Sequence, residues 1–244
     1  MGSRELNAKA GLSLSGNWLK LLAAVAMTAD HVGLVLLPQV PALRLVGRLA
    51  FPIFAFMIAE GCAHTRSGLR YFLHVLLLAA VCQTAYTVAM GSWYLCVPVS
   101  FALAIALVMA LNQWKKAQKT LQKCLWGAVF FLGVAAVWLL NRVVTLDYGF
   151  WGCMMPVGAS LLRRKREDDP LPAWLDQNFF HVLAMGLFMA PLALWLGAWQ
   201  WWSFLALPLL SCYSGRRGRY KMKYFFYIFY PAHLLVVQAI AMFA

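Results

Sequence analysis

Charged residues are scarce in this 244-residue sequence. Asp, Glu, Lys and Arg together make up 12% of it, about half of what a typical soluble domain carries. Among the charged residues, the eight Asp and Glu are far fewer than the 21 Lys and Arg, and hydrophobic residues reach 63% of the sequence. This composition excludes a disordered chain, a typical cytosolic enzyme and, despite the net charge of +13, a nucleic-acid-binding domain.

The common motifs of soluble enzymes are also missing. The sequence has no GxSxG, HExxH, P-loop or Rossmann fingerprint. Its six cysteines show neither CxxC spacing nor a Cys/His cluster, so neither a metal site nor a disulfide framework is predicted. No cleavable signal peptide is predicted, because the first apolar run contains Asp30 and His31 and no small-residue cleavage site follows it.

Long apolar runs are what the sequence has instead. A membrane-spanning helix needs about 20 mostly apolar residues. Nine runs meet or approach this length: 18–37, 48–63, 70–90, 94–112, 124–141, 149–162, 178–196, 199–213 and 224–243. The sequence therefore predicts an all-α fold, a polytopic transmembrane bundle of about nine helices, in which a short segment, 1–17, precedes a single transmembrane domain, 18–244.

The positions of Lys and Arg predict the orientation of this bundle. Lys20 lies inside the first span, and alternating the connections places only Arg44, Arg48 and Arg142 on one side. All the other Lys and Arg fall on the opposite side, which the positive-inside rule makes cytoplasmic. The N-terminus, segment 1–17 included, is therefore predicted to be cytoplasmic and the C-terminus external. The basic connections either fix orientation alone or also attract an anionic cosubstrate.

Ionisable side chains inside predicted spans are the main candidates for function, because burying them in lipid is costly. Asp30 and His31 lie near the middle of the first span. Neighbouring residues point about 100° apart on a helix, so at least one of the pair must meet polar partners. A histidine at this depth can accept a proton, and a nearby carboxylate can orient its ring. The alternative is a structural hydrogen bond or ion pair between helices.

Two further groups lie on the first and last spans. Lys20 shares a helix face with His31 and lies about 16 Å nearer the cytoplasm, where it either meets ligand phosphates or snorkels to the interface. In the last span, Pro231 has no N–H to donate and leaves a backbone carbonyl near Tyr230 and His233. These groups predict a polar pocket, or simply polar helix packing.

The second span adds Arg48 at its outer end and Glu60 near its inner end. Arg48 is predicted either to bind a carboxylate of the acceptor or to pair with Asp147, which lies in the external VTLDYGFWG stretch. Glu60 is predicted either to take part in the site or to pair with Arg66 or Arg70 at the interface.

Five strings, in order along nearly the whole chain, resemble landmarks of the TraX family: LKLLAAVAMTADHVG, GRLAFPIFAFMIAEG, CQTAY, LDYGFWG and KYFFYIFYPAHLL. The resemblance implies N-terminal acetylation of pilin, and a place among the acyltransferase-3-like transmembrane acyltransferases, which take an acyl group from cytoplasmic acyl-CoA. It also implies a multi-pass protein of the bacterial inner membrane.

The resemblance and the buried polar groups together give an expected mechanism. His31 is expected to act as general base on an amine or hydroxyl acceptor, with Asp30 orienting it and His233 acting on the thioester. The expected substrate-binding residues are Arg48, Glu60, Gln83, Asp147, Tyr148 and Tyr230. Lys20, Arg216, Arg217 and Arg219 are expected to bind acetyl-CoA or another acyl-CoA, and no metal is expected. The acceptor is a peptide, a glycan or a small molecule, and membrane lipid is the other expected partner.

Two other classes of function remain open from the residues. In a proton-coupled transporter of small solutes, Asp30, His31, Glu60 and His233 would form a proton relay. In a non-catalytic membrane component of a conjugation or secretion apparatus, the same groups would hold helices together.

Overall fold

The computed structural model describes residues 13–90, 94–219 and 222–243. The predicted N-terminal segment therefore lies mostly outside the described residues, as do Arg4, Lys9 and Lys221. The described chain is helical, and its only strand-like features are two isolated bridges, Leu14 with Tyr213 and Leu95 with Leu146. The helices are α1 (Gly16–Val35), α2 (Pro41–Gly47), α3 (Ala50–His64), α4 (Gly68–Met90), α5 (Val97–Lys116), α6 (Thr120–Val143), α7 (Gly149–Leu161), η2 (Ala173–Leu175), α8 (Asn178–Leu196), η3 (Ala198–Leu205), α9 (Ala206–Ser211) and α10 (Lys223–Phe243).

Seven of the nine predicted spans coincide with helical segments that are long and apolar enough to cross a membrane. Within the described residues these are Gly16–Val35, Pro41–His64, Gly68–Thr87, Val97–Lys116, Thr120–Val143, Asn178–Leu196 and Phe225–Phe243. The other two predicted spans are helical but shorter. Run 149–162 is the 13-residue α7, and run 199–213 is divided between the 3₁₀ helix η3 and the six-residue α9.

The chain divides into two compact units, residues 1–54 with 202–244 and residues 55–201. The prediction of a single transmembrane domain from residue 18 onward stays a prediction. In the first unit, the side chain of Ser15 caps α1 by accepting from the backbone N–H of Trp18. The extended stretch 212–217 lies along the start of α1, since Gly16 N donates to Arg216 O at 2.8 Å and Asn17 N to Arg217 O at 3.0 Å.

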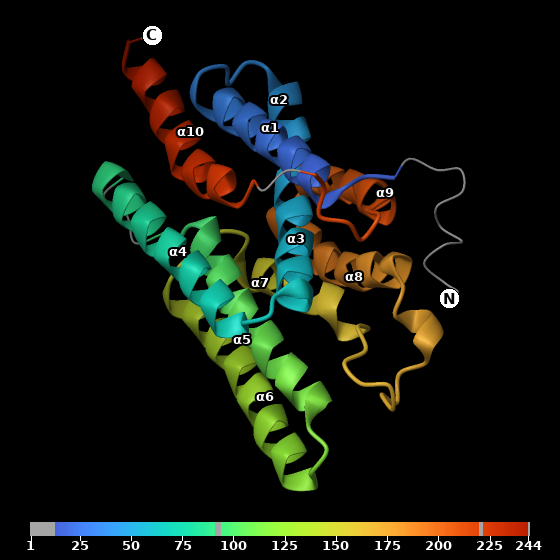
Figure 1. The fold of residues 1–244 in the computed structure, drawn as a ribbon. Helices are drawn as coiled ribbons and strands as arrows, with labels where there is room; N and C mark the ends of the chain where they lie inside the picture. Colours follow the sequence, from blue (N-terminus) through green and yellow to red (C-terminus); the bar gives the residue numbers. More distant parts are fainter. Residues whose placement is uncertain (1–12, 91–93, 220–221, 244) are drawn as a thin grey trace. The chain divides into compact units, whose positions relative to one another are not determined.

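Helices α1 and α2 form a close hairpin in the first unit (Figure 1). Two glycines permit the approach. A Cβ atom added at Gly33 would lie 2.7 Å from Leu43 Cβ, and one added at Gly47 would lie 2.3 Å from Asp30 Cβ. Helix α10 also packs against α1, through an apolar cluster that includes Met27, Phe229 and Tyr230.

In the second unit, α5 packs against α4, α6 and α7, and α7 packs against α8. Figure 1 shows α4, α5 and α6 as neighbouring green rods. Leu107, Val108, Leu111, Cys153, Met154 and Val157 form the core where α5 meets α7. Large apolar side chains such as Leu121, Leu132 and Val143 of α6 point outward, at 71%, 69% and 85% exposure. Such a surface is stable against lipid and unstable in water.

Helix α7, with 13 residues, packs along the 20-residue α5, and contacts near both ends of α7 join it to α5. At its start, Leu95 pairs in parallel with Leu146, and the Ser100 hydroxyl donates to Asp147 O at 3.1 Å. At its end, the Lys115 ammonium donates to Ser160 O at 3.0 Å. Residues 142–148 and 163–177 therefore lie at opposite ends of α7, the second beside the end of α5, which is the arrangement that the sixth predicted span requires.

Candidate functional site

His31 of α1 and His233 of α10 face each other in the first unit. The two ring centroids are 5.0 Å apart in an edge-to-face arrangement, and His233 Nε2 lies 3.4 Å from His31 Nδ1. His233 is only 6% exposed, whereas His31 is half-buried. The structure thus brings together two of the three predicted catalytic residues, although 202 positions separate them in sequence.

The backbone determines which ring nitrogens carry hydrogen. His31 Nδ1 lies 2.8 Å from Met27 O, and His233 Nδ1 lies 3.0 Å from Phe229 O. A carbonyl oxygen only accepts, so both Nδ1 atoms donate, and in the neutral rings both Nε2 atoms carry the lone pair. His233 Nε2 therefore faces an N–H of His31. The basic nitrogen of His31 is its Nε2, for which the described residues provide no partner.

Asp30 does not orient His31 in this structure. Its Oδ2 accepts from Arg44 Nη1 at 3.1 Å, across the α1–α2 hairpin. The two side chains leave α1 in different directions, as the 100° rotation per residue requires. Asp30 Oδ1 is buried and has no hydrogen-bond partner within the described chain. The predicted role of Asp30 thus shifts from the histidine to an ion pair between helices.

Aromatic rings enclose the other side of His233. Phe229 stacks on it at 5.1 Å between centroids, and Tyr230 meets it edge-on at 5.7 Å. Pro231 lies inside α10, which continues past it to Phe243. The structure therefore brings Tyr230 and His233 into contact within an aromatic cluster, and the polar pocket stays a prediction.

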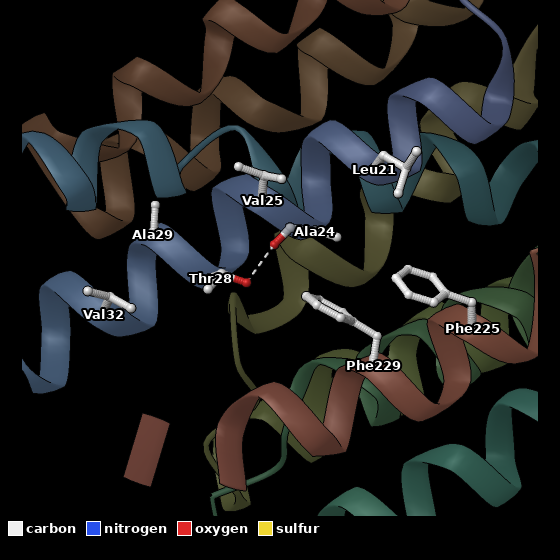
Figure 2. A pocket seen from close by; sticks show the side chains of 8 residues that line it. All are labelled: Leu21, Ala24, Val25, Thr28, Ala29, Val32, Phe225 and Phe229. Atoms are coloured by element: carbon white, nitrogen blue, oxygen red, sulfur yellow. Dashed lines mark hydrogen bonds between the residues drawn. The ribbon is translucent and has the colours of Figure 1, made fainter. Parts of the chain in front are cut away.

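An apolar groove of about 390 Å³ runs between α1 and α10, and one of its lining residues, Phe229, stacks on His233. Figure 2 shows Phe225 and Phe229 projecting from α10 toward α1, which lines the groove with Leu21, Ala24, Val25, Thr28, Ala29 and Val32. Thr28 is the polar member of this lining, and its hydroxyl donates to Ala24 O of its own helix at 3.0 Å. Such a wall suits hydrocarbon better than groups that need hydrogen bonds.

The predicted acyl-CoA residues gather at the start of α1. Arg216, Arg217 and Arg219 are exposed, and the first two lie on the stretch that pairs with Gly16 and Asn17. Lys20 is half-buried, with Nζ 5.8 Å from the centroid of the Phe226 ring. These cations are therefore at the end of the groove lined by Leu21 and Phe225.

Arg48 lies in the first unit, in the turn between α2 and α3. Pro52 falls in the first turn of α3, where a proline is tolerated because its N–H would have no helical partner. Arg48 Nε is buried and lacks a hydrogen-bond partner among the described residues. This donor is compatible with the predicted binding of a carboxylate.

Glu60 pairs with Arg163 in the second unit, and its Oε2 is 3.5 Å from His64 Nδ1. The predicted pairing of Glu60 with Arg66 or Arg70 was wrong. The connection after α7 folds back against the end of α3 and brings Arg163 to the Glu60 carboxylate.

The end of the second unit opposite to the Glu60–Arg163 pair contains three predicted substrate-binding residues, Gln83, Asp147 and Tyr148. Asp147 Oδ1 accepts from the Tyr94 hydroxyl at 3.1 Å, and the Gln83 amide bonds to Tyr94 O and to Cys96 N, both at 3.0 Å. Burial, and then the nearby Asp147 charge, raise the pKa of Tyr94. Tyr148 precedes α7 in a left-handed conformation, at φ 59°. Gln83 and Asp147 thus hold loops together here.

Several partners were missed from the sequence. Arg44 and Asp30 lie about equally far from the Leu37 turn, a symmetry that could have identified the pair. His181 of α8 is 4% exposed, and its Nε2 lies 3.0 Å from Asp176 Oδ1. No sequence signal marks the Glu60–Arg163 pair. Among the described residues, no group of three or more His, Cys, Asp or Glu is placed to hold a metal ion.

Apolar helices of spanning length, outward-facing apolar side chains and a histidine pair within two of these helices define a multi-pass helical membrane protein. Residues 15–241 match the family model described as TraX protein, so the chain belongs to the TraX family.

Two relatives add to this assignment. A probable fimbrial assembly protein, FimC of serogroup H1, from Dichelobacter nodosus is 25% identical over 267 positions, which cover 95% of this chain and 98% of the relative. An uncharacterized protein of Rickettsia prowazekii (strain Madrid E) is 53% identical over 38 residues, 16% of this chain and 15% of that protein. No solved structure gives a significant match.

Proposed function

We propose that this protein is an acyltransferase of the bacterial cytoplasmic membrane that moves an acyl group, most simply acetyl, from acyl-CoA to an amine or hydroxyl. The single observation that carries the proposal is the contact between His31 and His233. His31 Nδ1 donates to Met27 O and lies 3.4 Å from His233 Nε2, which leaves His31 Nε2 as a base on the helix that forms one wall of the apolar groove.

In this reaction His31 Nε2 takes a proton from the acceptor as the acceptor atom bonds to the acyl carbon. The carbon–sulfur bond breaks, and the thiolate leaves and takes up a proton, so the products are an amide or ester and a free thiol. His233 Nε2 faces His31 Nδ1. This geometry favours a positioning role for His233, in which it accepts from His31 Nδ1–H and stabilises the positive charge of the His31 ring.

Acyl-CoA supplies the activated acyl group as a thioester. Lys20, Arg216, Arg217 and Arg219 would hold its phosphates, since cations at the start of α1 fit an anionic ligand. The apolar groove fits the amide-bearing arm of CoA poorly. We therefore assign the groove to the apolar part of the acceptor.

The acceptor we propose is the N-terminal amine of a fimbrial or pilin subunit. Two findings support this choice, namely membership of the TraX family and the relative named as a probable fimbrial assembly protein. A non-catalytic role in fibre assembly is the second candidate, because the name of that relative mentions assembly alone.

The test uses the detergent-purified protein with acetyl-CoA and a synthetic peptide that has a free N-terminal amine and an apolar N-terminal segment. A thiol reagent reports CoA release, and mass spectrometry reports acetylation of the peptide. Release that matches peptide acetylation, and that disappears in His31→Gln, supports the proposal. If the folded wild-type protein produces neither free thiol nor modified peptide, the assembly role replaces it.

A further inference from the structure

The connection between α7 and α8 is folded onto the second unit rather than extended into solvent. Arg163 pairs with Glu60 of α3. Lys115 of α5 donates to Arg163 O at 3.0 Å, and Arg166 Nη1 donates to Ala117 O at 3.1 Å. Residues 163–166, Arg-Arg-Lys-Arg, are therefore held against the ends of α3 and α5.

Donor groups in this stretch are buried without acceptors. Arg163 Nε and Arg164 Nε have no hydrogen-bond partner within the described residues, and the Arg163 side chain is only 12% exposed. Lys165 is half-buried, and no ion pair of its ammonium is found in the described chain. Leaving a buried charged donor unsatisfied is costly, which points to a missing acceptor.

Four of the nearby carboxylates are already engaged. Glu60 is held by Arg163, and Asp168 by Arg166. Asp169 accepts from the backbone N–H groups of Lys165 and Leu171, at 3.2 and 3.1 Å. Asp176 lies beside buried His181. Arg164 Nη2 donates to the backbone oxygen of Glu167, whose side chain is exposed, and among the described residues neither Arg164 nor Lys165 forms an ion pair with a carboxylate.

Like charges crowd this stretch. Burial, and then the neighbouring Arg163 and Lys116 charges, lower the pKa of Lys165. Cations that only set membrane orientation need no burial, because the positive-inside effect depends on which side they occupy. Holding them together and half-buried costs free energy that a bound anion would offset. Arg guanidinium groups match the paired oxygens of phosphate geometrically.

We propose that Arg163, Arg164 and Lys165 form a binding site for a phosphate or diphosphate group. The ligand is either soluble or the headgroup of an anionic phospholipid, and both present the same oxygens. This site belongs to the second unit, and the proposal does not depend on the proposed acyl transfer.

The experiment uses the full-length protein in phosphatidylcholine nanodiscs, titrated calorimetrically with inorganic pyrophosphate. We expect saturable binding that weakens at least about tenfold in Arg164→Gln/Lys165→Gln, since two charge-assisted contacts are lost. The matched control, Lys119→Gln/Lys123→Gln, removes two exposed cations near the same end of α5 and is expected to bind as the wild type does. The charge-conserving Arg164→Lys/Lys165→Arg variant shows that binding follows charge rather than a change in folding.

A second arm identifies the source of the phosphate. In nanodiscs containing phosphatidylglycerol, a site for lipid headgroups retains this lipid in native mass spectrometry, loses it in Arg164→Gln/Lys165→Gln, and no longer binds pyrophosphate. A site for soluble phosphate binds pyrophosphate equally in both nanodiscs. The proposal is overturned if neither ligand binds saturably, or if the control variant loses as much affinity as the Arg164→Gln/Lys165→Gln variant.

Discussion

At the scale of single residues, substitutions in the histidine pair distinguish a role in the chemistry from a role in the structure. His31→Gln removes the basic Nε2 but keeps a side chain of similar size. We expect acyl transfer to fall by about 10²–10⁴, the usual contribution of a general base, with no change in thermal unfolding. Initial rates of CoA release, compared at equal amounts of folded protein, measure the effect. A His31→Gln protein with the wild-type rate would contradict the mechanism.

His233 offers a finer test of positioning. His233→Gln keeps a side-chain carbonyl near His31 Nδ1–H, whereas His233→Ala removes the side-chain acceptor and leaves this donor to Met27 O. We expect kcat to fall more in the alanine variant than in the glutamine variant, with the KM for acyl-CoA unchanged. An equal loss in both variants, or a loss confined to KM, would instead indicate direct contact with the thioester.

Asp30 is expected to affect stability more than chemistry, because its partner is Arg44. Asp30→Asn leaves a partly buried guanidinium unpaired and should lower the free energy of unfolding by about 1–3 kcal/mol. Asp30→Asn/Arg44→Gln removes both charges and should recover part of this loss. Thermal unfolding in detergent measures both variants. A double variant less stable than Asp30→Asn would argue against the pair.

At the scale of helices, a larger side chain in the wall of the groove between α1 and α10 can fill it while the histidine pair and the cations at the start of α1 stay unchanged. Ala29→Leu adds bulk to the groove wall, whereas Leu22→Phe adds bulk to an outward-facing position of the same helix. We expect Ala29→Leu to raise the KM for an apolar acceptor about tenfold while the KM for acyl-CoA stays the same. Steady-state kinetics with each substrate varied in turn separate the two. A matching rise with Leu22→Phe would mean that the effect is not specific to the groove.

The hydrogen bond between Tyr94 and Asp147, which joins two loops of the second unit, should make the stability of the protein depend on pH. Because the pKa of Tyr94 is raised in the folded protein, the unfolded state loses this proton first as pH rises above about 10. Stability should therefore fall above pH 10, and Tyr94→Phe should flatten this fall while lowering stability at neutral pH. Melting temperatures between pH 8 and 11 test this, and identical slopes for both proteins would refute it.

Helix positions were predictable from the sequence, and the pairing of side chains was less so. The run 178–196 coincides with α8, because length and hydropathy alone define a spanning helix. The partner of Glu60 lies 103 positions away and that of His31 lies 202 away. Those contacts depend on how helices pack, which composition does not encode. Asp30 and Arg44, only 14 positions apart, are the exception, since a short hairpin joins them.

At the scale of the whole molecule, the structure makes the membrane topology testable. The ends of α7 place Asp147 and Arg163 at opposite ends of the second unit. Single cysteines introduced at 145 and 167 in a protein lacking its own cysteines should therefore be labelled from opposite sides of the membrane, 167 from the cytoplasm. Labelling of both positions from one side would mean that α7 does not cross, which would remove the sixth predicted span.

The short α7 also has an electrical consequence. Its 13 residues rise about 20 Å, whereas the hydrocarbon of a bilayer is about 30 Å thick. A crossing α7 would therefore bring the two aqueous phases closer together here than elsewhere in the membrane. The membrane potential would fall over this shorter path, so the local field beside α7 would be about one and a half times the average. A charge moving along α7 would then gain most of the transmembrane voltage within a few helical turns.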